Sequence, residues 1–557
     1  MQVDLVLQNG RFWTGDRSRP HVSRLGVING MIVGVGDDLD GVTAAVTVDL
    51  DGATVLPGFH DAHCHTTSYG LSAEMLDLRD VRGMDAILRA VKMHAQGLPS
   101  DAWVIGVGYA RGLQVDEHPV AGALDLASGG RPVWLTHASG HMCVVSRSAL
   151  ELLRGHAQGG ELPRGFGLDE GGGETGLLTE FEMDLVKDFH GPSSIEHLVD
   201  VIEGATRSYA ADGITAFTDA GIGCPGIDHS PLEVAAYQTA ELRGRLHARA
   251  HLMVYSELLH EIGGHTDDRA RLGLDLGLHT GLGDGLVAIS AVKVWVDGSG
   301  IGNTAAKSDQ ADGGYGGLVA DPAALRDLIV EANMSGWQVA VHAMGDAAVD
   351  LFLDALDASA PHRRLGAPSP RHRVEHGGLI RRDQVPRLAA HGVLVATQPS
   401  FIPEFGDRLR ETLLDGGVRV EESFRCASLL AADIPIAGSS DRPVSSSAPL
   451  DGIQAMVERL TESGWLYGGN ERLSVEEAIV AYTYAGAYGV HAEHRRGVIR
   501  TGLDADFAVL ADDPTTVDTQ RIGEIAVVGT VLGGRPTHDP AGLLARATDI
   551  IDDGPRR

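Results

Sequence analysis

The residues best suited to do chemistry gather first in Leu56–His65, which reads LPGFHDAHCH. Residues two apart in a β-strand point to the same face, about 6.5–7 Å apart along the chain. His63 and His65 are therefore expected to project together, while Cys64 points away. Two neutral imidazoles on one face suit a cation such as Zn²⁺, which binds histidine nitrogen at about 2.0–2.1 Å. Because an H-x-H pair also arises by chance, the metal interpretation needs further ligands.

Such ligands recur near the ends of later apolar runs. His342 lies in VAVHAMGD, His376 in RVEHGG, and Asp441 ends PIAGSSD. Unrelated histidines would scatter over helices and loops, whereas these fall in order on separate expected strands. Barrel enzymes place their chemistry at the carboxyl ends of strands. The pattern therefore predicts that these side chains converge around a cation.

Lys293 stands inside the apolar run ISAVKVWVDG. Burying a bare ammonium is unfavourable and lowers the pKa of the lysine. A neutral amine can add carbon dioxide to become an anionic carbamate, whose two oxygens could bridge a pair of metals. A buried lysine paired with a carboxylate such as Asp297 is the alternative, and both interpretations stay open.

The elements that would position these residues alternate helix and strand through the middle of the chain. Eight strands are expected, at residues 54–65, 213–221, 246–255, 286–298, 338–346, 371–378, 393–400 and 435–441. This alternation is the pattern of an α/β fold built on a closed (β/α)8, TIM-like barrel. A doubly wound open sheet is the competing fold, but no Gly-rich phosphate-binding fingerprint follows an early strand.

The two ends of the chain differ from this middle. Both carry period-two apolar patterns broken by turn residues, which are typical of hairpins. Residues 1–57 and 491–540 are therefore predicted to form one small β-sandwich domain, with residues 541–557 as a C-terminal tail. Residues 58–490 are predicted to form the barrel, with an insertion at about 70–200 after its first strand because that connection is too long for one crossover.

Composition restricts the partners. The formal net charge of the 557 residues is -31, which argues against nucleic acid and an anionic membrane. The four cysteines lie far apart, which favours reduced thiols over a disulfide framework. No signal peptide or membrane-spanning run is recognised, so a cytoplasmic protein is expected.

Several phrases together resemble the amidohydrolase superfamily, and within it the YtcJ-like amidohydrolase family 3 that includes N-substituted formamide deformylases. The resemblance spans nearly the whole chain and is carried by LPGFHDAHCH, SGHMCVVSRSAL, ETGLLTE, GITAFTDAG, VKVWVDGS, VAVHAMGDAAVD, RVEHGGLI and GSSDRPV. Two departures from the family pattern stand out. Arg147 occupies the place of an Asn, and the sequence Ser-Ser-Asp-Arg replaces the usual Gly-Ser-Asp around Asp441.

The resemblance implies a metal centre of His63, His65, His342 and His376, with Asp441 as ligand and proton acceptor. It also implies that a carboxylated Lys293 bridges two metals, with one or two divalent ions per chain and Zn²⁺ favoured. Candidates for substrate contact are His141, Glu180, Trp295, Asp297 and Gln398.

Some of these side chains have an alternative role in the fold. Asp346, four residues after His342, is expected to orient a ligand imidazole, or else to cap the helix that follows. Trp295 could line the substrate space or simply pack in the barrel. Arg373 and Glu375 are interpreted as a structural ion pair.

The predicted function is hydrolysis of a non-peptide carbon–nitrogen bond, in an amide, formamide or cyclic amide, by metal-activated water. The same site acting on an ester, lactone or carbamate is one alternative, and a metal-binding barrel without catalysis is another. The expected partner is a small-molecule substrate, and a homodimer is one option for the oligomeric state.

Overall fold

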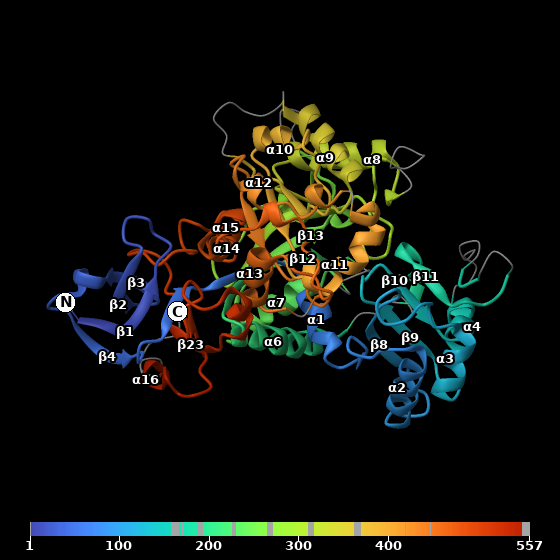
Figure 1. Cartoon of the computed structure of the whole chain (residues 1–557), viewed down its shortest axis with the longest axis horizontal. Coiled ribbons are helices and arrows are strands. Elements are labelled where there is room, and N and C mark those ends of the chain that lie inside the picture. Colours follow the sequence, from blue (N-terminus) through green and yellow to red (C-terminus); the bar gives the residue numbers. More distant parts are fainter. Residues whose placement is uncertain are drawn as a thin grey trace.

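The computed structural model of the chain describes residues 2–156, 166–168, 172–183, 185–186, 193–224, 230–264, 271–309, 317–360, 369–417, 419–445 and 447–548. Three sheets stand side by side in Figure 1: the sheet that contains both ends of the described chain on the left, a central barrel, and a sheet from residues 76–179 on the right. This arrangement confirms the α/β fold class and the presence of an insertion after the first barrel strand. The predicted domain boundaries themselves stay a prediction.

Eight parallel strands form the barrel, in the spatial order β20-β19-β18-β17-β16-β13-β12-β6. Their bounds are β6 Phe59–Cys64, β12 Ile214–Ile222, β13 Arg249–Tyr255, β16 Val287–Trp295, β17 Val339–Ala343, β18 Arg373–His376, β19 Leu394–Thr397 and β20 Ile436–Gly438. The segment after β20 closes the barrel on β6, because the Asp441 amide donates to the His63 carbonyl at 2.8 Å and the His65 amide donates to the Arg442 carbonyl at 2.7 Å. Closure therefore runs through the proposed ligands.

Helices cover the outside of these strands (Figure 1). They are α1 Thr66–Ser72, α6 Ile195–Ala211, α7 Glu233–Leu242, α8 Pro322–Met334, α9 Asp346–Ser359, α10 Val385–His391, α11 Phe401–Thr412, α12 Ala427–Leu430, α13 Pro449–Glu458, α14 Val475–Ala481 and α15 Tyr484–Gly489. Helix α6 shows why such segments fold: the Ser194 hydroxyl accepts the His197 amide at 3.2 Å, and Leu198 and Ile202 are buried against the strands.

The first expected strand, residues 54–65, is in fact two strands. Thr54–Pro57 is β5, which belongs to the terminal sheet, and Phe59–Cys64 is β6 of the barrel. They are separated at Gly58, where an added Cβ would lie 2.1 Å from Oγ1 of Thr215. The terminal sheet therefore leads directly into the strand that carries the H-x-H pair.

The terminal sheet has the order β23-β22-β21-β5-β1-β2-β3, with β4 paired to β1. Its strands are β1 Gln2–Trp13, β2 His21–Ile28, β3 Met31–Val35, β4 Thr43–Asp49, β21 Phe507–Leu510, β22 Val527–Leu532 and β23 Arg535–His538, followed by the short helix α16 Ala545–Thr548. Buried residues such as Phe12 and Phe507 give it a core of its own. Strands from both ends of the chain thus share one sheet, as the sequence predicts.

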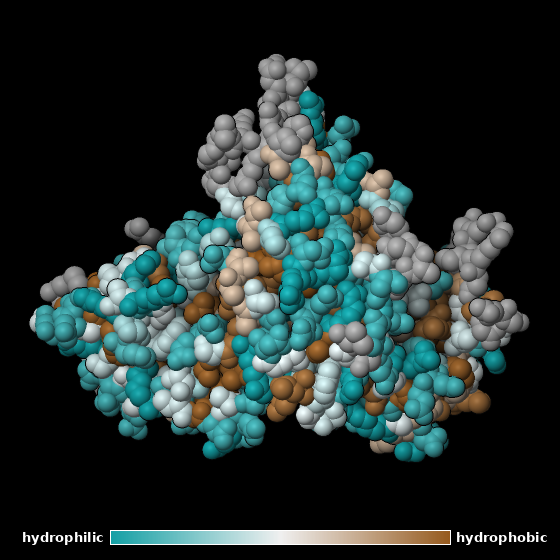
Figure 2. All heavy atoms as spheres, turned by 45° about the horizontal axis from the view of Figure 1, so that its top comes forward, coloured by the Kyte–Doolittle hydropathy of each residue, from teal (hydrophilic) through white to brown (hydrophobic). Residues whose placement is uncertain are grey.

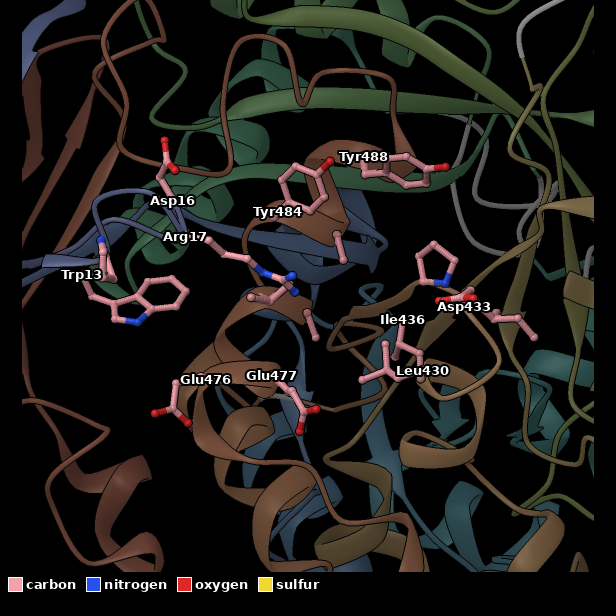
Figure 3. A pocket seen from close by; sticks show the side chains of 17 residues that line it. Trp13, Asp16, Arg17, Leu430, Asp433, Ile436, Glu476, Glu477, Tyr484 and Tyr488 are labelled. Carbon is pink, nitrogen blue, oxygen red and sulfur yellow. The ribbon is translucent and has the colours of Figure 1, made fainter.

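A groove of about 700 Å³ separates this sheet from the barrel. Figure 3 shows Trp13 of β1 and Arg17 of the turn that follows β1 on one side of it and Tyr484 of α15 on the other. The groove reaches Ile436, the first residue of β20, so it lies at the amino end of that strand. The proposed ligands lie at the opposite, carboxyl end of the strands.

The insertion forms a five-stranded sheet of order β11-β10-β9-β8-β7. Its strands are β7 Leu76–Asp77, β8 Val104–Tyr109, β9 Val133–His137, β10 Met142–Val145 and β11 Leu177–Thr179, and its helices are α2 Met84–Gln96, α3 Ala121–Ser128 and α4 Arg147–His156. The loop between β9 and β10 carries His141. The insertion thereby brings a histidine from outside the barrel sequence to the site described below.

The visible surface is largely hydrophilic. Figure 2 shows hydrophilic residues over most of the visible face, with hydrophobic residues scattered between them. Among the described residues, no helix is long and apolar enough to cross a membrane. All four cysteines are buried and free, as expected for reduced thiols.

Candidate metal centre

Two histidines and an aspartate meet where β6 and β20 close the barrel. Nε2 of His65 lies 3.1 Å from Oδ1 of Asp441, and Nε2 of His63 lies 3.4 Å from the same oxygen. One ligand atom from each residue falls within a group whose members are all within 4.8 Å of one another. All three side chains are buried, so two nitrogens and one carboxylate oxygen converge away from bulk water.

His63 is fixed from behind by Glu375 of β18. Its Nδ1 lies 2.5 Å from Oε2 of Glu375, and since a carboxylate only accepts, Nδ1 carries the proton and Nε2 keeps a lone pair. Glu375 in turn accepts two bonds from Arg373, at 2.7 and 3.1 Å. The expected ion pair of Arg373 and Glu375 is therefore formed, and it also orients a proposed ligand, which strand periodicity does not predict.

His342 and His376 present a second pair of nitrogens. Nδ1–H of His376 donates to Oε1 of Gln398 at 2.8 Å, and Nε2–H of His342 donates to the Gly298 carbonyl at 3.1 Å. The two remaining nitrogens, Nε2 of His376 and Nδ1 of His342, face each other at 3.0 Å. Both then carry lone pairs, which repel unless a cation lies between them.

A proton is a poor candidate for that cation. Burial lowers the pKa of both imidazoles well below their usual value. The Lys293 ammonium and one neighbouring imidazole, His376 for His342 and His63 for His376, lower it further. A metal fits better, because ligands at about 2.0–2.1 Å in a tetrahedron stand about 3.3 Å apart. The donor set of imidazole nitrogens and a carboxylate oxygen is also one that Zn²⁺ and similar divalent ions accept.

Lys293 lies beside His63. Its Nζ is 3.5 Å from Nε2 of His63 and 4.6 Å from the centre of the Trp295 ring. The side chain is fully buried, and burial lowers the pKa of its amine to about 8. A substantial neutral fraction at physiological pH is what carbamate formation requires.

The alternative partner of Lys293, Asp297, is engaged elsewhere. Its carboxylate accepts the amides of Ala306, Met344 and Gly345 at 2.7–3.0 Å and lies 3.7 Å from Nε2 of His342. No ion pair joins it to Lys293 in the described part of the chain. Burial raises the pKa of Asp297 to about 7, against the lowering by the three amides. Asp297 thus anchors the segment after β17 instead of neutralising the lysine.

The other predicted substrate contacts lie at different distances from the proposed ligands. His141 reaches the site, with its ring centre 5.4 Å from that of His342, and the Trp295 ring stacks 6.3 Å from His342. Gln398 is buried behind His376, where it orients the ring. Glu180 begins the short 3-10 turn Glu180–Met183, and its side chain lies outside the described residues.

Asp346 contacts two arginines and no ligand imidazole among the described residues. It is the first residue of α9, and its carboxylate bonds to Arg381 at 2.9 Å and Arg419 at 3.0 Å, with a further bond from the Ser308 hydroxyl. Burial would raise its pKa, but these donors lower it to about 2. In the described part of the chain the carboxylate makes no bond to His342 and caps no amide of α9, so Asp346 ties the start of α9 to Arg381 and Arg419.

A closed parallel barrel with histidines, a lysine and an aspartate at its carboxyl rim defines a class, the barrel hydrolases that use a metal. The chain belongs to the amidohydrolase family, whose model matches residues 46–538. This confirms the resemblance seen in the sequence.

Individual relatives cover nearly the whole chain. Protein LONG AFTER FAR-RED 3 of Arabidopsis thaliana is 30% identical over 96% of this chain and 92% of its own length. YtcJ of Bacillus subtilis is 30% identical over 88% of this chain and 90% of its own length. The N-substituted formamide deformylase of Arthrobacter pascens is 25% identical over 97% of this chain and 99% of its own length. Among solved structures, an uncharacterized metal-dependent hydrolase from Pyrococcus horikoshii matches with a TM-score of 0.71 and 25% identity, covering 92% of this chain and 99% of that one.

Proposed function

We propose that the chain hydrolyses a non-peptide carbon–nitrogen bond in a small amide, with formamides and cyclic amides as the first class to test. The observation that carries this proposal is the buried convergence of His63, His65 and Asp441 beside the facing lone pairs of His342 and His376. The relative from Arthrobacter pascens, named as a deformylase of N-substituted formamides, supports the choice of substrate class.

A divalent cation held by the four histidines and Asp441 would acidify water and polarise the substrate carbonyl. Asp441 takes the proton of the attacking water on its carboxylate as the new C–O bond forms. It then delivers that proton to the nitrogen as the C–N bond breaks, so that the products are a carboxylic acid and an amine. His141 is placed to donate to the carbonyl oxygen as negative charge develops there.

Lys293 completes the proposed site as a carbamate. Its neutral amine adds to carbon dioxide and loses a proton, which leaves an anion beside His63. Lowering of the amine pKa to about 8 by burial supports this step. Zinc as the metal, carboxylation of Lys293, a homodimer and a cytoplasmic location all stay predictions.

The test is a panel of N-substituted formamides and cyclic amides, each paired with the ester of the same acyl group. A larger acceleration over the uncatalysed reaction for the amides than for the matched esters supports the proposal, and the reverse would assign the site to ester chemistry. Asp441→Asn should lose turnover by about a hundredfold or more while the protein still contains metal. Absence of hydrolysis across the panel by metal-loaded wild type would favour a binding protein without catalysis.

A further inference from the structure

The three histidines that are anchored from behind are anchored unequally. His63 donates to a carboxylate at 2.5 Å, His376 to a side-chain amide at 2.8 Å, and His342 to a backbone carbonyl at 3.1 Å. A hydrogen bond to an ionised acceptor is roughly twice as strong as one between neutral groups. The bond to Glu375 therefore holds the His63 ring most firmly and pushes most electron density toward its free nitrogen.

Glu375 is held in place by Arg373. Arg373 donates to both of its oxygens, and the same guanidinium donates to the Ala62 carbonyl at 2.7 Å, one residue before His63. Glu375 and Arg373 are both fully buried. The pair is neutral overall and fully hydrogen-bonded, which is what allows a charge at this depth. It ties β18 to β6 and prevents the carboxylate from rotating away from His63.

The opposite end of the site lacks such support. The hydrogen-bond acceptors behind His342 and His376 are neutral, and the Asp297 carboxylate stays 3.7 Å from Nε2 of His342, beyond hydrogen-bond distance. The His63 end adds the carboxylate of Asp441, 3.4 Å from Nε2 of His63. Carboxylate-backed histidines bind metals more tightly, and loss of that outer partner typically weakens affinity 10–100-fold. The two ends should therefore differ in affinity although both are built from histidine.

We infer that Glu375 is a positioning residue which makes the His63, His65 and Asp441 end of the site bind its metal first and most tightly. The inference rests on the proposed function, because it assumes that the site holds metal. It assigns a sequence of loading: the first ion at the closure of the barrel, and the second at His342 and His376.

The experiment is a titration of the metal-free full-length chain with Co²⁺, followed by competition with a chelating dye and by the cobalt absorption spectrum. Wild type should bind in two steps whose affinities differ at least tenfold. Glu375→Gln keeps the size of the side chain and should weaken the first step about 10–100-fold, leaving the second within about threefold. If only one ion binds, the same variant should weaken that step.

Glu493→Gln is the matched control. Glu493 makes a similar paired contact with Arg371, at 2.6 and 2.9 Å, but contacts none of the proposed ligands. Removing its charge should leave both binding steps unchanged. A control that weakened metal binding as much as Glu375→Gln would show a general effect of lost ion pairs and would overturn the inference.

Gln398→Glu keeps the test decisive if Glu375→Gln does not fold. It places a carboxylate behind His376 and should raise the affinity of the second metal-binding step. The difference in affinity between the two steps should then become smaller. Two equal steps in wild type, an unchanged first step in Glu375→Gln, or an unchanged second step in folded Gln398→Glu would each overturn the inference. Wild type that binds no metal at all would instead defeat the proposed function, so the two failures are distinguishable.

Discussion

Asp346→Asn separates the two roles that the sequence allows for this aspartate. In the structure its carboxylate binds Arg381 and Arg419 and no ligand imidazole. We therefore expect the variant to lose stability and to keep its affinity for metal. If Asp346 oriented His342, metal affinity would fall instead.

The magnitude follows from the pKa. The pKa of the Asp346 carboxyl group is lowered from 3.8 to about 2. Each pKa unit corresponds to about 1.4 kcal/mol, which gives about 2.5 kcal/mol of stabilisation. Arg381 is partly exposed to solvent, and screening there reduces the effect to about 1–2 kcal/mol. With about 2.1 cal/mol/K of unfolding entropy per residue over 557 residues, that loss lowers Tm by about 1–2 °C.

The sign of the pH dependence is also fixed. A carboxyl group whose pKa is lower in the folded protein stabilises it above the unfolded pKa, and the effect is lost as the pH falls from 3.8 toward 2. The difference in Tm between wild type and Asp346→Asn should therefore be constant from pH 5 to 8. Thermal unfolding at several pH values measures it, together with the metal content of both proteins. A difference that changes between pH 5 and 8, or stability equal to wild type, would refute the reasoning.

Three further predictions concern the rim of the barrel. Gly345→Ala should lower stability by about 3 kcal/mol or more, because the added Cβ would lie 1.8 Å from the Ala306 carbonyl oxygen. Gly204→Ala on α6 is the control in the same thermal assay: its added Cβ meets nothing within 4 Å, so it should not destabilise the protein. His141→Ala should reduce kcat/KM about tenfold at unchanged metal content, and wild-type kinetics would remove His141 from the site. Lys293→Met should lose activity about tenfold or more, and adding bicarbonate should not restore it. Wild type depleted of carbon dioxide should regain activity when bicarbonate is added; if it does not, the carbamate is excluded.

Much of the fold is visible in the sequence because local pattern determines it. Alternating apolar runs located all eight barrel strands, and the residues at their ends include every proposed ligand. The boundary inside residues 54–65 was missed, because β5 and β6 both read as one apolar run. Only the close approach of Thr215 to Gly58 shows where the chain leaves one sheet for the other.

The residues that hydrogen-bond to the proposed ligands from behind could not be predicted from the sequence. Glu375 contacts His63 across 312 positions of the chain, and Gln398 contacts His376 across 22. Strand periodicity shows which face a side chain takes, but it does not identify the neighbour on the adjoining strand. Asp297 was expected near the substrate or the lysine, and the structure gives it three backbone amides instead. Such assignments need the register between strands, which the sequence alone does not supply.

His376 and Asp441 both adopt left-handed backbone conformations, with φ of 75° and 61°. A residue with a side chain is disfavoured there by about 1 kcal/mol or more, whereas glycine is not. Both positions therefore keep a side chain where glycine would be less strained. The retained strain agrees with a role for these two side chains in the proposed metal centre, and it marks them as positions where backbone comfort is given up for side-chain placement.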